Sequence, residues 1–306
     1  MKPPAPPKDS GVDRRRRTAA LSAQRPGLTA RPVHRITGRS CDLESAQDLV
    51  TVEAALQIQL AGDPFLTTMR TPGRDHDLAL GLLFAEGLIE HAEDVSTIAH
   101  CGRPTDEGYG HTLDVTPGPG HAFDPERVVA ARRVGHAGCG VCGRTAIADL
   151  LSRCQRPPPP RNQVPRALLW QALGALQAQQ CDFSLSGGCH AAAALDNGGK
   201  LLAHAEDVGR HNAVDKAIGA ILRERPAPRA AGVGASLLSV LAVSGRASFE
   251  LAQKAVAAGA QVLCSVSAPS SLAIDVAEAA GLCLVGFARD GQANVYTHPT
   301  MLHHAD

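Results

Sequence analysis

The stretch GHAGCGVCGRTAI, residues 135–147, carries two cysteines, Cys139 and Cys142, at a spacing that allows several chemistries. A CxxC pair can supply half of a zinc site, act as a redox dithiol, or carry a group covalently on one thiolate. It can also be two inert cysteines in a loop. The rest of the chain must separate these possibilities.

The residues around the pair favour covalent carriage. A structural zinc site needs two more ligands, and the chain has no second CxxC. A thioredoxin-like dithiol sits on a rigid strand-to-helix turn, whereas glycines flank this pair on both sides. Nearby basic side chains would lower the pKa of a thiol here, namely Arg132, Arg133, His136 and Arg144. The sequence therefore favours a thiolate carrier over a zinc site, a redox dithiol or inert cysteines.

A second group of polar residues follows the ends of predicted strands. In EDVGRHNAVDKAIG and AVSGRASFELAQKA a strand meets a helix, and helix N-termini bind anions. SVSAPSS repeats this arrangement, and LSGGCHAAA places a histidine before another strand. Capped helices with solvated first turns would look similar. The candidate binding residues are Arg210, His211, Asp215, Lys216, Ser244, Gly245, Arg246, Ser267 and His190.

The elements that would position these residues form an α/β pattern. VTVEAALQIQLAGDPFLTTMRTPG predicts a hairpin, and RDHDLALGLLFAEGLI predicts a helix capped by Asp75. HTLDVTP and RVVAARRV, within residues 96–134, are expected to be strands. Four prolines, residues 157–160, predict a linker. From residue 165 onward, strands alternate with helices, which is typical of a layered domain with parallel central strands.

Composition limits the class of protein. Of 306 residues, 44% are apolar and 3% aromatic. Few aromatic side chains are therefore present on which nucleic-acid bases could stack. Residues 1–35 carry nine Lys or Arg against two Asp, a net charge of +7, and predict a disordered basic tail. We find no apolar run long enough for a membrane span, and no export signal, and expect a cytoplasmic protein. Two of the nine cysteines, Cys264 and Cys283, lie in apolar runs and are expected in the core.

Together these motifs resemble the FdhD family, the formate dehydrogenase accessory sulfurtransferases. The matching stretches are TPGRDHDLALGLLFAEGLI, GCGVCG, SGGCHAAAL, EDVGRHNAVDKAIG, VSGRASFELAQKA and SVSAPSSLAIDVAEAAGLCLVGFAR. They lie within about residues 45–297. EDVGRHNAVDKAIG and VSGRASFE are the specific ones, since a CxxC alone occurs in many proteins.

The resemblance implies a sulfur carrier that takes persulfide sulfur from a cysteine desulfurase. It would pass the sulfur to the bis-molybdopterin guanine dinucleotide form of the molybdenum cofactor, which the formate dehydrogenase apoenzyme needs. Cys139 and Cys142 would carry the persulfide, and the strand ends would hold the guanine nucleotide. A homodimer is also implied. The alternative is a cofactor-binding chaperone whose CxxC is a redox or docking element.

The resemblance also implies a cytidine-deaminase-like, three-layer C-terminal domain with a mixed sheet, beside a smaller, β-rich α+β domain. Deamination itself is not expected, because the helices lack the His-x-Glu and Pro-Cys-x-x-Cys zinc motifs. The predicted divisions are a tail (1–35), an N-terminal domain (36–156), a linker (157–164), the α/β domain (165–300) and a terminal tail (301–306).

Overall fold

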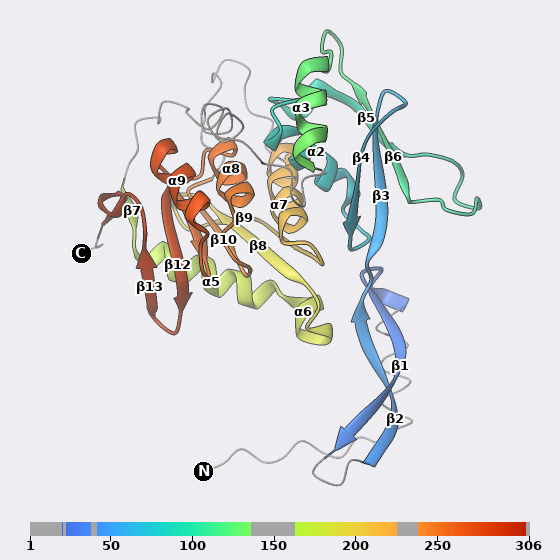
Figure 1. The fold of residues 1–306 in the computed structure, drawn as a ribbon, viewed down its shortest axis with the longest axis horizontal. Coiled ribbons are helices and arrows are strands. Elements are labelled where there is room, and N and C mark those ends of the chain that lie inside the picture. The colour runs from blue at the N-terminus through green and yellow to red at the C-terminus, as the bar shows by residue number, and fades with distance from the viewer. Residues whose placement is uncertain (1–19, 21–22, 38–41, 136–162, 225–237, 304–306) are drawn as a thin grey trace.

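A computed structural model describes residues 20, 23–37, 42–135, 163–224 and 238–303 (Figure 1). Its largest sheet has six strands in the order β13-β12-β11-β10-β8-β9. The central strands β10, β11 and β12 run parallel, and β8, β9 and β13 pair antiparallel. The strands are β8 (His190–Leu195), β9 (Leu201–Asp207), β10 (Val240–Val243), β11 (Val262–Ser265), β12 (Cys283–Arg289) and β13 (Gln292–Val295).

Helices cover both faces of this sheet, and side-chain alternation explains how. In β10, Leu241 and Val243 join the core under α7, α8 and α9, whereas Val240 and Ala242 join the core under α5. Successive side chains of a strand point to opposite faces, so every residue of β10 is buried. The helices are α5 (Ala167–Gln179), α6 (Cys181–Ser186), α7 (Arg210–Glu224), α8 (Phe249–Ala257) and α9 (Ser271–Ala280). The predicted alternation of strands and helices is confirmed.

The first part of the chain forms a second sheet and a projecting ribbon. The sheet has the order β4-β3-β6-β5 and packs against α2. The predicted hairpin is confirmed as β3 and β4, with a left-handed turn at Ala61 and Gly62. The elements are β1 (Leu28–Thr37), β2 (Asp42–Thr51), β3 (Ala54–Leu60), β4 (Asp63–Arg70), α2 (Asp75–Ala85), the 3₁₀ turn η1 (Ala92–Asp94), β5 (Val95–His100), β6 (Thr112–Pro117) and α3 (Pro125–Gly135).

Three expected boundaries differ from the structure. Residues 28–35, assigned to the disordered tail, belong to β1, which pairs with β2 over ten residues in a ribbon that extends away from the rest (Figure 1). At the other end, β7 (Val164–Pro165) pairs with β14 (Leu302–His303), beyond the 3₁₀ turn η3 (Pro299–Met301). The end of the predicted linker and the start of the predicted terminal tail therefore form strands. Each supplies the hydrogen bonds of the other, although they are far apart in the sequence.

The expected strand RVVAARRV is also wrong, since it lies in α3. Its valines have high β propensity, but Asp124 accepts hydrogen bonds from the amides of Glu126 and Arg127. Pro125 occupies the first helical position, where its missing N–H costs nothing. This Asp-Pro start signal outweighs the apolar run.

Asp75 does not cap α2 as predicted. The N-cap is Arg74 in a left-handed conformation, without a side-chain cap. Asp75 is instead buried and receives two hydrogen bonds from Arg70, at 2.9 and 3.0 Å. The Asp75 carboxylate therefore forms an ion pair that joins α2 to Arg70 of β4.

Candidate functional site

The ends of three strands bring several predicted site residues together. The carboxyl end of β10 lies beside the amino end of β8, and His190 of β8 pairs with Asp207 at the end of β9. Gly245 follows β10 and lies between His190 and Arg210. A Cβ atom on Gly245 would be 3.2 Å from His190 Nδ1 and 3.4 Å from Arg210 Cβ. A side chain at this position would be tightly packed against both residues, and glycine leaves that space free.

Serines fix the loops that follow β10 and β11. Ser265 is buried, and its hydroxyl donates to the carbonyl of Gly245 at 2.7 Å. The Ser244 hydroxyl accepts a hydrogen bond from the amide of Ala191 at 2.9 Å. Ser267 is half-buried and donates its amide to Ser265 Oγ at 3.2 Å. These contacts join the strand ends into one surface.

The charges at this surface differ in their surroundings. Burial lowers the pKa of His190, and the nearby charges of Arg210 and His211 lower it further, so this ring stays neutral at neutral pH. The Nε atom of Arg210 is buried and has no hydrogen-bond partner among the described residues. Arg246 is exposed at the start of the same loop. An unpaired guanidinium N–H beside a neutral histidine is suited to an anionic ligand.

His211 is held by residues that the sequence reasoning missed. Its Nε2 lies 2.6 Å from Glu250 Oε2 and 3.1 Å from Ser248 Oγ. The hydrogen bond from His211 lowers the pKa of Glu250, so this side chain is a carboxylate at neutral pH. Both residues lie within VSGRASFE, but their role depends on His211, which precedes Ser248 by 37 residues.

Two of the predicted ligand residues do not belong to the site. Lys216 is only 2% exposed, and its ammonium contacts Asp207 at 2.7 Å and the Thr71 carbonyl at 2.8 Å. Asp215 is buried and pairs with Lys254 at 2.7 Å. Both side chains are committed to interior ion pairs, so the prediction that they bind ligand is wrong.

A cavity of about 400 Å³ opens beside the strand ends and shares His190 and Ser244 with them. α5, α6 and the following glycines form its walls. Cys189 also lines it, and burial raises the pKa of that thiol. Its lining residues are Leu173, Leu176, Gln177, Gln180, Phe183, Gly187, Gly188, Cys189, His190, Ser244 and Val266.

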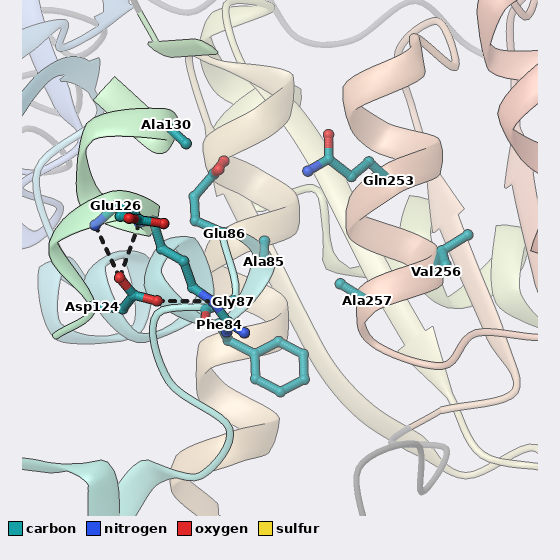
Figure 2. A pocket seen from close by; sticks show the side chains of 11 residues that line it. Phe84, Ala85, Glu86, Gly87, Asp124, Glu126, Ala130, Gln253, Val256 and Ala257 are labelled. Carbon is teal, nitrogen blue, oxygen red and sulfur yellow. Dashed lines mark hydrogen bonds and ion pairs between the residues drawn. The ribbon is translucent and has the colours of Figure 1, made fainter. Parts of the chain in front are cut away.

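A separate groove of about 470 Å³ lies between α3 and α8, at the end of α2 (Figure 2). Figure 2 shows Asp124, Glu126 and Ala130 on one side and Gln253 and Val256 on the other. The remaining lining residues are Phe84, Ala85, Glu86, Gly87, Arg127 and Ala257. None of the predicted site residues lines this groove.

The predicted sulfur-carrying residues, Cys139 and Cys142, lie outside the described residues. The chain enters their segment from the carboxyl end of α3 at Gly135. Cys264 and Cys283 are in the core as predicted, and burial raises the pKa of each thiol to about 12.

Two general features of the described residues bear on function. They contain no cluster of three or more His, Cys, Asp or Glu side chains that could hold a metal ion. In the same part of the chain, every helix is too short or too polar to cross a membrane.

Comparison with known proteins agrees with the motifs. The FdhD/NarQ family model matches residues 51–303. A sulfur carrier protein FdhD from Anaeromyxobacter dehalogenans is 52% identical over 257 residues, which are 83% of this chain and 88% of that protein. Another, from Mycobacterium tuberculosis, is 42% identical over 82% of this chain and 90% of that protein.

A solved structure shares the fold. It is a crystal structure of a protein assigned as a formate dehydrogenase accessory protein, from Desulfotalea psychrophila. The TM-score is 0.68 at 22% identity, covering 91% of this chain and all of the other. On the family match and the two relatives, this chain belongs to the FdhD/NarQ family.

Proposed function

We propose that this protein is a sulfur carrier, a sulfurtransferase that serves formate dehydrogenase. Membership of a family whose members include sulfur carrier proteins supports the proposal, together with the CxxC pair. The observation that carries the ligand site is the unpaired Nε of Arg210 beside His190, at the strand ends.

The first step loads sulfur. The thiolate of Cys139 or Cys142 attacks the outer sulfur of a persulfide on a cysteine desulfurase. The new S–S bond takes the electron pair of the attacking thiolate, and the desulfurase cysteine leaves as a thiolate. The proton of the persulfide stays with the transferred sulfur.

The second step releases it. The other thiolate of the pair attacks the inner sulfur of the loaded cysteine, forming a disulfide and expelling HS⁻. Sulfide is the oxidation level that a terminal sulfido ligand on molybdenum requires. The recipient is the bis-molybdopterin guanine dinucleotide cofactor, as a substrate, before it enters the formate dehydrogenase apoenzyme. Reduction of the disulfide by a cellular dithiol restores the pair.

The nucleotide end of that substrate binds at the strand ends. Arg210, Arg246 and the amino end of α7 receive phosphates, because a helix N-terminus and guanidinium groups both favour anions. Ser244, Gly245 and Ser267 shape the surface, and His190 and His211 manage protons there.

The proposal keeps the remaining expectations from the sequence. They are a cytidine-deaminase-like arrangement of the α/β domain, a division near the proline run, and a homodimer. A carrier that works through free thiols needs a reducing compartment, so we place it in the cytoplasm.

Mass spectrometry tests the carrier step directly. Incubation with a desulfurase and cysteine should add about 32 Da, one sulfur atom, to the protein. The gain should disappear in the Cys139→Ala/Cys142→Ala double variant and persist in Cys101→Ala, an exposed cysteine outside the motif. If the double variant keeps the gain, the assignment of the carrier cysteines is wrong. No gain in the unmutated protein, with nucleotide binding intact, would favour the chaperone alternative.

Titration with GDP tests the ligand site. Arg210→Ala should weaken binding about tenfold or more, because it removes a charge-assisted hydrogen bond. Arg103→Ala is the control, since Arg103 is exposed in the loop between β5 and β6. Equal affinities in the two variants would remove the nucleotide from the strand ends.

A further inference from the structure

Two serines occupy the same position at successive strand-to-helix junctions, but their side chains act differently. Ser270 precedes α9 and caps it, accepting a hydrogen bond from the amide of Ala273 at 3.2 Å. Ser248 precedes α8 and makes no cap. Its hydroxyl lies instead 3.1 Å from His211 Nε2. Because serine is among the best capping residues, the missing cap needs a reason, and His211 supplies it.

Glu250, in the first turn of α8, contacts the same ring nitrogen. Its Oε2 is 2.6 Å from His211 Nε2, so the contact is short, as charge-assisted hydrogen bonds are. A carboxylate only accepts hydrogen bonds, so the hydrogen of a neutral imidazole must be on Nε2. Within the described part of the chain, nothing hydrogen-bonds Nδ1 of this ring.

We infer that Glu250 is a positioning residue for His211: with the Ser248 hydroxyl beside it, its carboxylate holds the ring hydrogen at Nε2 and leaves Nδ1 to accept a hydrogen bond from an N–H or O–H group of the ligand. The inference rests on the proposed function, since it deepens the strand-end site. Neither residue was identified from the sequence.

The surroundings of the pair are consistent with this assignment. Arg210 and Lys254 lie close enough to Glu250 to favour its charged form. Lys254 is itself paired with Asp215 of α7, so α8 is tied to α7 at two places, four residues apart along each helix. The His211 ring is therefore fixed relative to both helices.

The tautomer of His211 is the direct test. The full-length protein, labelled with ¹⁵N-histidine, gives signals from thirteen histidines, and that of His211 is identified by its loss in His211→Gln. At alkaline pH, without ligand, we expect hydrogen on Nε2 only. In Glu250→Ala, the Ser248 hydroxyl can donate to Nε2, so the Nδ1–H form should appear.

A matched control uses a similar pair outside the site. Glu278 Oε2 lies 3.6 Å from His298 Nε2 near α9, and Glu278→Ala should leave His211 unchanged. A merely structural role for Glu250 would shift the melting temperature without changing the tautomer. Hydrogen on Nδ1 in the unmutated protein, or the same tautomer in Glu250→Ala, would overturn the inference.

Titration with GDP separates this inference from the proposed function. Glu250→Ala should weaken GDP binding by about two- to tenfold, the effect of losing one hydrogen bond from a guanine N–H or ribose O–H donor to Nδ1, and Glu278→Ala should not. If the unmutated protein does not bind GDP, the proposed nucleotide site is wrong, while the tautomer still decides the role of Glu250. If GDP binds equally to both variants, His211 does not meet the ligand.

Discussion

Some polar side chains of α7 face the strand-end site and others form buried ion pairs, and the sequence alone does not tell the two groups apart. Arg210 and His211 are partly exposed at the strand ends, whereas Asp215 and Lys216 are buried in ion pairs. Burial of an ion pair removes both charges from water, so each partner depends on the other. At the residue scale, α7 contributes only its first turn to the site.

Replacing Lys216 tests this division. Lys216→Met leaves the Asp207 carboxylate buried without its cation and should lower the free energy of unfolding by about 3–5 kcal/mol. Lys200→Met, at an exposed lysine of the turn between β8 and β9, should change it by less than about 0.5 kcal/mol. Urea unfolding measures both. A loss of GDP affinity in Lys216→Met without loss of stability would return Lys216 to the ligand site.

Sequence reasoning predicted the polar cluster but not its partners. The carbonyl that Lys216 contacts is 145 residues away, on Thr71, and no local pattern indicates that pairing. Glu250 was missed for a similar reason: a first-turn glutamate commonly interacts with its own helix dipole. By contrast, Gly245 lies between a buried strand and the next helix, and that local context placed it at the strand ends.

At the scale of elements, α2 and α7 lie side by side (Figure 1), and their backbones meet at two glycines. A Cβ atom on Gly81 would lie 1.9 Å from the Asp215 carbonyl oxygen, and one on Gly219 would lie 1.9 Å from that of Asp77. Any side chain at either glycine must push the helices apart. This contact sets the position of α7, and hence of Arg210 and His211, relative to the first sheet.

Alanine substitution at Gly219 should therefore be costly. Gly219→Ala is expected to destabilise the protein by about 3 kcal/mol or more through overpacking. Gly174→Ala, on an exposed face of α5 with nothing within 4 Å of the new methyl group, should stabilise it by about 0.5–1 kcal/mol. Thermal unfolding distinguishes the two. Equal effects would mean that the helices do not meet at these glycines.

Most elements were predictable because their signals are local. The strands and helices after residue 165 have clear apolar periodicity, and the β3–β4 hairpin has a turn that tolerates left-handed residues. The ribbon β1–β2 was missed because Arg31, Pro32 and Arg35 resemble a polar tail. Its strands are specified by pairing with each other, which composition does not reveal.

At the scale of the whole molecule, the fold buries most of the cysteines that lie among the described residues. Cys189, Cys264 and Cys283 are buried, and Cys101 and Cys181 are exposed. Burial raises the pKa of all three buried thiols, so almost none of their thiolate is present at neutral pH. Sulfur exchange requires a thiolate, and the core therefore keeps these cysteines out of it.

Alkylation of the folded protein at mildly alkaline pH should show this protection. Cys101 and Cys181 should be labelled quickly, and Cys189, Cys264 and Cys283 only after unfolding in urea. Peptide mapping by mass spectrometry gives the extent at each position. Rapid labelling of Cys264 in the folded protein would show that the α/β core opens readily.

The Asp207 carboxylate accepts hydrogen bonds from Gly209 and Asn212 at the start of α7, and from the amide of Thr71 in the first part of the chain. The Val208 amide in turn donates to the Thr71 hydroxyl. The geometry that presents Arg210 is thus built by both parts together. Such a site cannot be transferred with the α/β part alone. That part, fused to another protein, would carry Arg210 and His211 but would lack Thr71, whose amide and hydroxyl hold the start of α7.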